Sequence, residues 1–501
     1  MINYKYYNYF NKFFLLIVLL FNNVFININN SSKFNTTNIP ELYYNNNQTI
    51  HLLIPPKKCH LTLFFFSDYK KNNNSVKIKR IKFIDKNYFI TFYESDNDYR
   101  DYYAILQKQG LIKSKYKLGK HNLFFSQINN NSLAQNYNNN YDLNKYQKVF
   151  RYLNGYKVFY KNTLYKLYME MKKLFSDDFD YMPETYNYPE QKNLIYNKFQ
   201  NYTFNSNDLW MIKPSNLFAG IGITIFRSLQ NVTLKEFVLT KYMTNIHLIN
   251  GKKYDLRLYI LITGLKPLRI YFYKEGLVRI AAEKFSLKEN SLDNKFIHLT
   301  GININIKNNN FVSPNSTKDE NANVWNILMY QNYLKKLNIK WVDIREKIKD
   351  LIIKSIISAY KKINEKNERE NVSDQSFFNL LGFDIIITNE FEPKLLEINE
   401  DPFMRYRFAL EKPDKVNIFI DTLNLIGIVP FSRRNEEPLN FKFLNRNIPD
   451  DNINNALCEL QRPMGDYELI FPTKENIYKY KKYFVYNTEE NKKFWEIIND
   501  K

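Results

Sequence analysis

Cysteine and glycine are scarce in this chain of 501 residues, which contains 2 Cys and 12 Gly. Cys59 and Cys458 permit one long-range disulfide at most, and no Cys-x-x-Cys pair is present. None of the five histidines is paired at metal-ligand spacing, so zinc is not expected. Any metal should instead be a hard cation held by oxygen atoms. So few cysteines favour a cytosolic location.

Long apolar runs are also rare. Phe13–Phe21 follows Lys5 and Lys12 and has the length of a signal-peptide core, but it is too short to span a bilayer comfortably. No small-x-small cleavage site follows it. Two interpretations stay open: a targeting or anchoring leader, or a buried element of a globular N-terminal region. Membrane association therefore stays uncertain at this point.

Acidic residues are outnumbered, and the net charge is +21. A basic chain binds an acidic partner, which is nucleic acid, an anionic membrane or an acidic protein segment. The alternative is that many of these lysines are solvated surface residues. A nucleic-acid binder needs basic residues interleaved with aromatics on one element, and such a pattern occurs only briefly at Tyr478–Tyr483. We therefore expect no nucleic-acid partner.

The chain divides by composition into four parts. Residues 1–30 are the apolar leader, and residues 31–145 are an Asn-rich N-terminal region with strand-like runs. Residues 146–430 carry all the recognisable chemistry, and residues 431–501 look like a polar tail with a terminal helix near Phe484–Ile498. Amphipathic periodicity predicts further helices at 162–175, 321–337 and 341–363.

Residues 254–286 alternate polar and apolar side chains and predict a meander of three strands, with turns at 264–267 and 274–276. The alternation collects four charged residues on polar faces over an apolar layer. These are Asp255, Arg257, Arg279 and Glu283. The two arginines are suited to phosphates or carboxylates, although ordinary cross-strand ion pairs with Asp255 or Glu283 are the alternative.

Two apolar runs near residue 390 predict a hairpin that carries a metal site. If the four-residue loop pairs Thr388 with Pro393, counting outward sets Asp384 opposite Glu397. Asn399 is two residues from Glu397 and shares its face. Two opposed carboxylates repel unless a cation lies between them, so we expect Asp384, Glu397 and Asn399 to bind Mg²⁺. A solvated surface hairpin is the alternative, which the apolar flanks disfavour.

Lys213 closes another apolar run and precedes a Gly-x-Gly pair, Gly220 and Gly222. Such a pair lets backbone N–H groups approach phosphates closely. The segment is neither a Walker loop nor a kinase loop, so the signal is weak without Lys213. Lys241 also closes an apolar run, and either nucleotide contact or a surface position suits it.

Several segments together resemble the tubulin–tyrosine ligase-like family, from about Asn154 to Gly427. The resemblance is carried by Leu209–Pro214, Gly220–Ile223, Gly251–Ile260, Pro267–Arg279, Phe296–Thr300, Leu381–Asp384, Leu395–Asn399 and Asp421–Gly427.

The resemblance implies an α/β ATP-grasp fold over residues 146–430. It also implies an enzyme that uses ATP and Mg²⁺ to ligate an amino acid to the acidic tail of tubulin through an acylphosphate. Glutamate is the expected amino acid, because most branches of the family glutamylate. Tyrosine or glycine addition, or an inactive microtubule-binding scaffold, is the alternative. The expected location is the cytoplasmic microtubule cytoskeleton, including the axoneme.

The family also implies roles for individual residues. Lys213, Gly220, Gly222, Lys241 and the adjacent Tyr242 match ATP contacts, Lys253 and Asp255 match the nucleoside side, and Arg257, Arg279 and Thr300 match the phosphate and substrate side. The trio Asp384, Glu397 and Asn399 matches the magnesium ligands.

Three positions depart from the family pattern. Ala219 stands where an arginine often precedes the glycine pair, Gly301 replaces an asparagine after His-Leu-Thr, and Asp401 replaces a serine or alanine. The first two changes remove polar groups from the acceptor side, so they leave open which amino acid is used.

Overall fold

The computed structural model describes residues 48–500 with internal gaps. The gaps are 57, 71–76, 84–89, 95–99, 115–120, 126–144, 151–157, 201–207, 216, 218–219, 228–234, 315–318, 370–372, 433–436 and 439–450. Asn46–Lys501 forms one compact unit, so the boundary expected between residues 145 and 146 does not separate two units. The apolar leader lies outside the described residues. Each helix within the described ranges is too short or too polar to traverse a bilayer.

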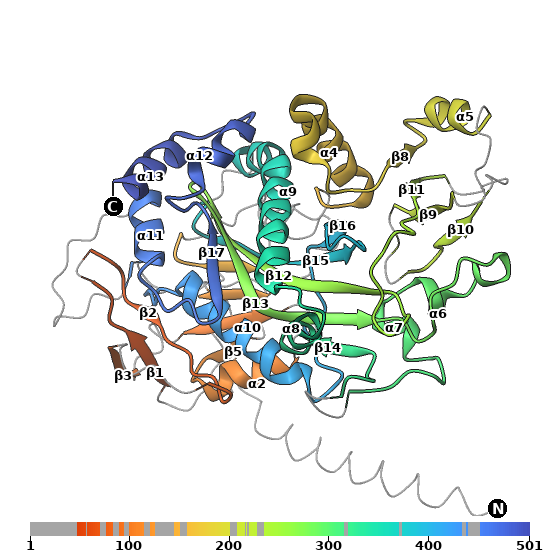
Figure 1. Cartoon of the computed structure of the whole chain (residues 1–501). Coiled ribbons are helices and arrows are strands. Elements are labelled where there is room, and N and C mark those ends of the chain that lie inside the picture. The colour runs from red at the N-terminus through yellow and green to blue at the C-terminus, as the bar shows by residue number, and fades with distance from the viewer. Residues whose placement is uncertain are drawn as a thin grey trace, which may run out of the picture. The chain divides into compact units, whose positions relative to one another are not determined.

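A ten-stranded mixed sheet organises the unit (Figure 1). Its path runs β14 (Val324–Asn326), β13 (Leu268–Ile280), β12 (Tyr254–Leu265), β15 (Phe377–Ile387), β7 (Lys148–Phe150), β6 (Leu123–Phe125), β4 (Thr91–Glu94) and β5 (Ile112–Ser114). β16 (Pro393–Asn399) also pairs with β15, and β17 (Tyr467–Phe471) pairs with β13. The strands from β14 to β15 are antiparallel, whereas β7, β6, β4 and β5 extend the sheet in parallel. The architecture is therefore mixed α/β, as expected.

The predicted three-strand meander was wrong, because β13 continues through the expected turn at residues 274–276. β13 pairs with β12 along one edge and with β17 and then β14 along the other, so neighbours on both sides keep it extended. Gly276 serves a close approach of two strands here, since a Cβ atom on it would lie 2.6 Å from the carbonyl oxygen of Arg257.

The predicted apolar layer forms the core. Leu256, Leu258, Ile260 and Ile262 on β12 are fully buried in one large cluster. Helix α9 (Trp341–Arg369) contributes its predicted stripe to the same cluster, and Figure 1 shows it lying across the sheet. Burying each aliphatic side chain of this size contributes about 1.5–3 kcal/mol, so this layer dominates the stability of the sheet. α4 (Lys161–Phe175) and α8 (Ile327–Lys336) pack on the same core.

A separate four-stranded antiparallel sheet has the order β10 (Thr224–Phe226), β9 (Trp210–Pro214), β11 (Phe237–Lys241) and β8 (Thr185–Tyr188). Trp210 and Ile212 face a small core that α5 (Lys192–Gln200) covers, whereas Leu209 and Met211 face a second cluster. Because side chains alternate along a strand, Lys213 shares the face of Leu209 and Met211.

The remaining elements are short. A three-stranded sheet has the order β2 (Thr62–Leu63), β1 (Gln48–Leu53) and β3 (Ile78–Phe83). The other helices are α2 (Arg100–Lys108), α6 (Lys295–His298), α7 (Ile302–Asn305), α10 (Glu411–Ile426), α11 (Asn452–Glu459), α12 (Ile477–Tyr480) and α13 (Glu489–Asn499). Single 3₁₀ turns lie at Ser176–Phe179, Glu289–Ser291 and Lys481–Tyr483.

The segment from residue 451 onward is not a polar tail. β17 is part of the large sheet, and Phe471 and Phe494 are fully buried in the main core. The terminal helix was predicted correctly, because α13 spans Glu489–Asn499. The tail reads as polar because its buried aromatics are spaced among many Lys, Asn and Glu residues.

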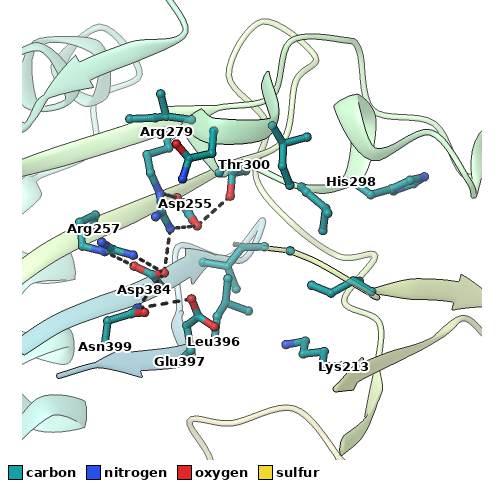
Figure 2. Close-up of a pocket in the computed structure, with 18 of the residues that line it drawn as sticks. Lys213, Asp255, Arg257, Arg279, His298, Thr300, Asp384, Leu396, Glu397 and Asn399 are labelled. Atoms are coloured by element: carbon teal, nitrogen blue, oxygen red, sulfur yellow. Dashed lines mark hydrogen bonds and ion pairs between the residues drawn. The ribbon is translucent and has the colours of Figure 1, made fainter. Parts of the chain in front are cut away.

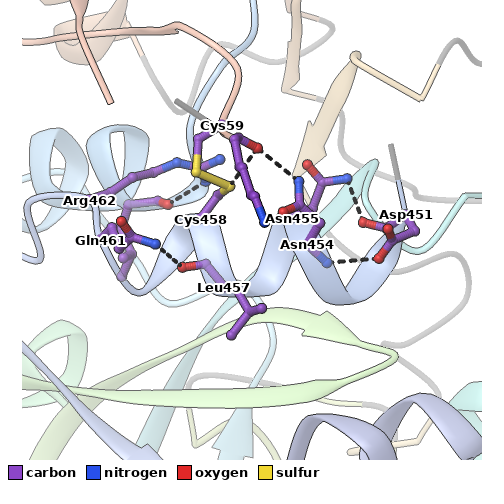
Figure 3. The surroundings of a disulfide bond; sticks show 10 residues. Cys59, Asp451, Asn454, Asn455, Leu457, Cys458, Gln461 and Arg462 are labelled. Carbon is purple, nitrogen blue, oxygen red and sulfur yellow. Dashed lines mark hydrogen bonds between the residues drawn. A yellow bond between two sulfur atoms is a disulfide. The ribbon is translucent and has the colours of Figure 1, made fainter. Parts of the chain in front are cut away.

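A disulfide joins Cys59 to Cys458 across a sequence separation of 399 residues (Figure 3). It connects the segment after β1 to α11, and both cysteines are buried. The single long-range bridge that the sequence permits is therefore formed.

We predict that Cys59→Ser lowers the free energy of unfolding of the oxidised protein by about 2–5 kcal/mol, because the bridge restricts a very long loop in the unfolded chain. Denaturant titration measures the change. In reducing buffer the variant and the wild type should unfold at the same midpoint. Full alkylation of both cysteines in denatured but unreduced protein would contradict the bridge.

Candidate active site

A pocket of about 320 Å³ lies between the four-stranded sheet and one end of the large sheet. β9 and β11 form one wall, and β12, β13, β15 and β16 form the opposite wall, with α6 and α7 beside them. Of the residues predicted for ATP, metal and catalysis, Gly222 alone does not line it. The lining includes Lys213, Gly220, Lys241, Tyr242, Lys253, Asp255, Arg257, Arg279, Thr300, Asp384, Glu397 and Asn399.

A row of paired charges crosses the large sheet at the pocket (Figure 2). Arg257 forms a bidentate pair with Asp384, Nε to Oδ1 at 2.5 Å and Nη2 to Oδ2 at 2.9 Å. Arg279 bonds Asp255 at 2.5 Å and also reaches Asp384 at 2.9 Å through the same Nη2. Thr300 Oγ1 donates to Asp255 at 2.8 Å. The predicted cross-strand pairing is thus present, and it continues into the metal-site hairpin.

Strand register explains why these groups meet. Asp255 is opposite Arg279, Arg257 is opposite Asp384, and Asp384 is opposite Glu397. A Cβ atom on Gly382 would lie 3.1 Å from Cδ of Arg257, so glycine there leaves room for the arginine side chain.

The predicted opposition of Asp384 and Glu397 is confirmed, but the residue pairs of the hairpin differ from those obtained by counting outward from the loop. The loop pairs Ile387 rather than Thr388 with Pro393, which alone would shift the register by one residue. A bulge between Ile385 and Asp384, at Leu396 of the partner strand, restores it. Leu396 itself lines the pocket.

The charge state of Asp384 is set by its neighbours. Burial alone would raise the pKa of this carboxyl, but the charges of Arg257 and Arg279, together with the hydrogen bonds from Arg257, hold the pKa well below its usual range. Asp384 is therefore ionised at any physiological pH.

Asp384, Glu397 and Asn399 fit a divalent cation of the Mg²⁺ type. Asn399 Nδ2 lies 3.3 Å from both Asp384 Oδ2 and Glu397 Oε1, so the three side chains converge. Turning the side-chain amide of Asn399 by 180° would direct its oxygen instead of its nitrogen toward the two carboxylates. That orientation would suit a cation bound between the three side chains. Among the described residues no three His, Cys, Asp or Glu side chains form a metal cluster. A pair of carboxylates suits Mg²⁺, which takes further ligands from water and substrate phosphates.

Lysines approach from the other side of the pocket. Lys213 on β9 lies across from the charge row (Figure 2), and Lys253 comes from just before β12. Burial lowers the pKa of Lys213 to about 8, against the opposing effect of Glu397. Burial and the charge of Lys213 lower the pKa of Lys253 to about 7. Neither forms an ion pair with a described residue.

A chain of hydrogen bonds positions Lys253. His298 Nε2 lies 3.1 Å from the carbonyl oxygen of Ser291 and must be the donor there. His298 Nδ1 therefore accepts from the hydroxyl of Tyr242 at 2.9 Å, and that hydroxyl accepts from Lys253 Nζ at 3.0 Å. Burial and the nearby Lys253 lower the pKa of His298 to about 4, so the imidazole is neutral. The family resemblance had implied that Tyr242 contacts ATP directly. In the structure its hydroxyl instead hydrogen-bonds His298 and Lys253.

Two other predicted groups are arranged less directly. Lys241 lines the pocket but pairs with Asp208 at 3.0 Å. Gly220 and Gly222 have φ angles of 74° and 73°, which strongly favour glycine. Gly220 also lies close to Ile304 of α7, where a Cβ atom would be 2.6 Å from Cδ1.

Four basic residues of the lining were missed by the sequence interpretation. Lys161 at the start of α4 lies 3.7 Å from Glu397. His298 belongs to the quoted His-Leu-Thr segment and was the one with a usable signal. Arg407 donates to Asn303, and the buried Lys415 pairs with Glu411 at 2.5 Å. No local pattern marks Lys161, Arg407 or Lys415, because only the tertiary fold brings them to the pocket.

Comparison with known proteins decides the family. The family model of the tubulin-tyrosine ligase family matches residues 137–437. The chain belongs to the tubulin-tyrosine ligase family.

Curated members of this family are similar over the same region. Tubulin monoglutamylase TTLL4 of Mus musculus is 30% identical over 289 residues, which are 57% of this chain and 24% of that protein. Tubulin polyglutamylase TTLL5 of Mus musculus is 31% identical over 290 residues, 57% of this chain and 22% of the relative. Tubulin polyglutamylase TTLL6 of Mus musculus is 29% identical over 368 residues, 69% and 44%. The chain thus spans about a quarter of the first two relatives.

We predict that nucleotide binding takes up protons near pH 8. Lys253, with a pKa of about 7, is largely neutral in the free protein, and a phosphate beside it favours the charged form. Affinity should therefore fall as pH rises from 7 to 9. Calorimetry of a non-hydrolysable ATP analogue in buffers of different ionisation enthalpy measures the uptake, and Lys253→Met should reduce it. Uptake unchanged in that variant would contradict the assignment.

The same shift has a stability consequence. Between pH 7 and 10.5 the unfolded chain binds more protons at Lys253 than the folded chain does, so this residue makes the free energy of unfolding rise with pH in that window.

We predict that Tyr242→Phe weakens nucleotide binding about 10-fold, because it removes one hydrogen bond to a charged group, worth about 1.5 kcal/mol. The ring that lies 4.3 Å from Lys253 Nζ is kept. Tyr360→Phe is the matched control, since its hydroxyl bonds the carbonyl of Leu265 in the core. The control should lose stability without losing nucleotide affinity. A greater loss of nucleotide affinity in Tyr360→Phe than in Tyr242→Phe would refute the role of the hydrogen bonds that position Lys253.

Proposed function

We propose that this protein is an ATP- and Mg²⁺-dependent ligase that adds glutamate to the acidic tail of tubulin. The observation that carries the proposal is the pocket in which converging carboxylates lie across from the half-buried Lys213 and near the buried Lys253, two lysines that form no ion pair with a described residue. A metal–triphosphate complex has the complementary charges. Similarity to tubulin glutamylases supports the substrate, and tyrosine or glycine as the added amino acid is the alternative.

We further propose that the fold is of the ATP-grasp type. A nucleotide between two sheets suits such a fold, and here the pocket lies between the four-stranded sheet and the ten-stranded sheet. Lys213 and Lys241 come from the smaller sheet, whereas the acidic residues come from the larger one.

In this proposal Asp384, Glu397 and Asn399 hold Mg²⁺, which supplies neutralisation of phosphate charge when bound. Lys213 and Lys253 bind phosphate oxygens, which places Lys253 at the phosphates rather than on the nucleoside side that the resemblance implied. Loss of hydration lowers the pKa of both lysines, and an anion there restores the charged form.

The reaction would proceed in two displacements. A glutamate carboxylate oxygen of the tubulin tail attacks the γ-phosphorus, forming an O–P bond while the bond to the β-phosphate oxygen breaks and ADP leaves. The amine of the incoming amino acid then attacks the acyl carbon, the C–O bond to phosphate breaks, and the amine loses a proton. Arg257 and Arg279, fixed by their carboxylate partners, stabilise negative charge that develops on the transferred group, together with Lys213.

Positive residues near the pocket support acidic substrates. Arg407 and Lys415 line the same pocket beyond the charge row, and the net charge of the chain is +21. An acidic peptide would be attracted to such a surface. Gly301 leaves its position open beside Ile304, with no polar group contributed there. This is consistent with an incoming amino acid whose carboxylate is bound by Arg407 rather than by a side chain at position 301.

An inactive microtubule-binding scaffold is the rival proposal. It would not require an intact metal trio or the buried lysines, so both features favour the enzyme. For location we propose the cytoplasm at microtubules, where the relatives' substrate is found. A disulfide is uncommon in that compartment, so Cys59 and Cys458 would be partly reduced there.

We predict that Glu397→Gln lowers ligation by about 10³-fold, because losing a metal ligand removes several kcal/mol of transition-state stabilisation. The assay offers purified protein labelled glutamate, glycine and tyrosine in turn, with ATP, Mg²⁺ and microtubules. Incorporation of glutamate above the other two is expected.

Glu390→Gln is the matched control. It lies in the loop of the same hairpin, is exposed, and accepts hydrogen bonds from Asn245, outside the pocket. It should retain full activity. Incorporation at the level of Glu397→Gln for all three amino acids would refute the ligase, and equal activity of the two variants would refute the metal site.

A further inference from the structure

A second cavity lies apart from the active pocket. It has a volume of about 30 Å³, and within the described ranges it shares no lining residue with the active pocket. Its walls come from the start of β7, the β12–β13 turn, the end of α10, helix α11 and the residue after Cys59.

The lining is strongly basic. Five cationic side chains face two carboxylates, those of Asp374 and Glu459. The cations are Lys145, Lys148, Lys266, Arg269 and Arg462.

Both carboxylate oxygens of Glu459 already accept hydrogen bonds from neighbouring side chains. Arg269 bonds it through Nε at 2.9 Å and Nη2 at 3.2 Å, and the hydroxyls of Thr263 and Tyr271 donate to it at 2.5 and 2.8 Å. Glu459 is buried, and the Coulomb attraction of Arg269 holds its pKa low against burial. Glu459 and Arg269 therefore compensate each other, which leaves Asp374 as the one other carboxylate among the four remaining cations of the described lining.

Lys148 and Arg462 bond neutral oxygens. Lys148 Nζ donates to the carbonyl of Gln375 at 2.5 Å, and Arg462 Nη1 donates to the carbonyls of Leu425 and Ile426 at 3.0 and 2.9 Å. Neither forms an ion pair with a described residue. Burial, followed by the charge of Arg462, lowers the pKa of Lys148 to about 7.

A purely structural role accounts for Arg462 but not for Lys148. Arg462 caps the last carbonyls of α10, and Gly427 makes room for it, since a Cβ atom there would lie 2.2 Å from the guanidinium carbon. Lys148 caps no helix, and its one hydrogen-bond partner among the described residues is the carbonyl of Gln375. Lys148 is half-buried, and shielding an ammonium group from water with so little compensation costs free energy that a bound anion would recover.

The disulfide joins two walls of this cavity (Figure 3). His60, next to Cys59, lines one wall, and Asn455, Glu459 and Arg462 on the other wall flank Cys458. Asn454 Nδ2 also donates to the carbonyl of Lys58 at 3.0 Å. Without the bridge, this hydrogen bond and a weak contact of Cys458 Sγ with the carbonyl oxygen of Lys58 at 3.6 Å would hold the Lys58–His60 segment against α11.

We propose that this cavity is a second anion site, which takes one small inorganic oxyanion such as phosphate or sulfate and is held closed by the Cys59–Cys458 disulfide. One water needs about 10–15 Å³, so the cavity has room for two or three waters or one tetrahedral ion, and none for a nucleotide. The site does not depend on the proposed ligase function.

The test measures the midpoint of thermal unfolding of the full chain against inorganic phosphate, at constant ionic strength set with chloride. Because the active pocket also attracts phosphate, the background variant is Lys213→Met. In that background we expect a saturable rise in midpoint with phosphate or sulfate, and no rise after the further change Lys148→Met. Lys266→Gln is a second variant, on the β12–β13 turn, should Lys148→Met fail to fold.

Three results would overturn the proposal. They are loss of the phosphate response in Lys213→Met alone, an unchanged response in the Lys148 and Lys266 variants, and equal competition by O-phosphoserine, which is too large for the cavity.

The disulfide has its own arm. Reduction, or Cys59→Ser, should weaken phosphate affinity in the Lys213→Met background at least 10-fold. In the otherwise unchanged protein it should leave the affinity for the ATP analogue unaltered. Equal phosphate affinity of the oxidised and reduced protein would refute the closing role of the bridge.

Discussion

The carboxylate of Asp384, held between Arg257 and Arg279, is the interaction on which the pocket depends. A charge buried in a sheet is tolerated only when paired, and this one is paired across three neighbouring strands. A slip of one residue in any of these strands would move a charge into the apolar core on the opposite face. The ion pairs and the aliphatic layer beneath them therefore specify the same register, and that register aims the metal-site side chains into the pocket.

The opposite wall has the reverse imbalance. Lys213 is half-buried and Lys253 is buried, neither forms an ion pair with a described carboxylate, and loss of hydration lowers the pKa of both. The chain of bonds from Ser291 through His298 and Tyr242 holds one of these ammonium groups in place before any ligand arrives. Preorganisation of this kind stabilises a bound phosphate because little reorientation is needed on binding.

Local periodicity predicted the site better than it predicted the fold. Alternation along β12 placed Asp255 and Arg257 on one face correctly, since a strand with one buried face follows its side-chain pattern. The turn expected at 274–276 failed because pairing on both edges outweighs local turn propensity. The opposition of Asp384 and Glu397 was predicted by a count that missed both the shorter loop and the compensating bulge at Leu396. The disulfide and the placement of the lysines in the second cavity depend on contacts between residues that lie far apart in the sequence. No local pattern encodes such contacts.

The cations of the active pocket and of the second cavity are of two kinds, those that an acidic partner neutralises and those without such a partner among the described residues. Arg269 and Glu459 neutralise each other completely with help from two hydroxyls, so that pair needs no ligand. Lys148 beside them, like Lys213 and Lys253 in the active pocket, has no such partner among the described residues. Folding alone gains nothing from a shielded ammonium group without an acidic partner, and an anion that binds the folded state would supply the missing compensation. The surplus of cations over their described partners, rather than the number of cations, is what supports the proposal of an anion at each cavity.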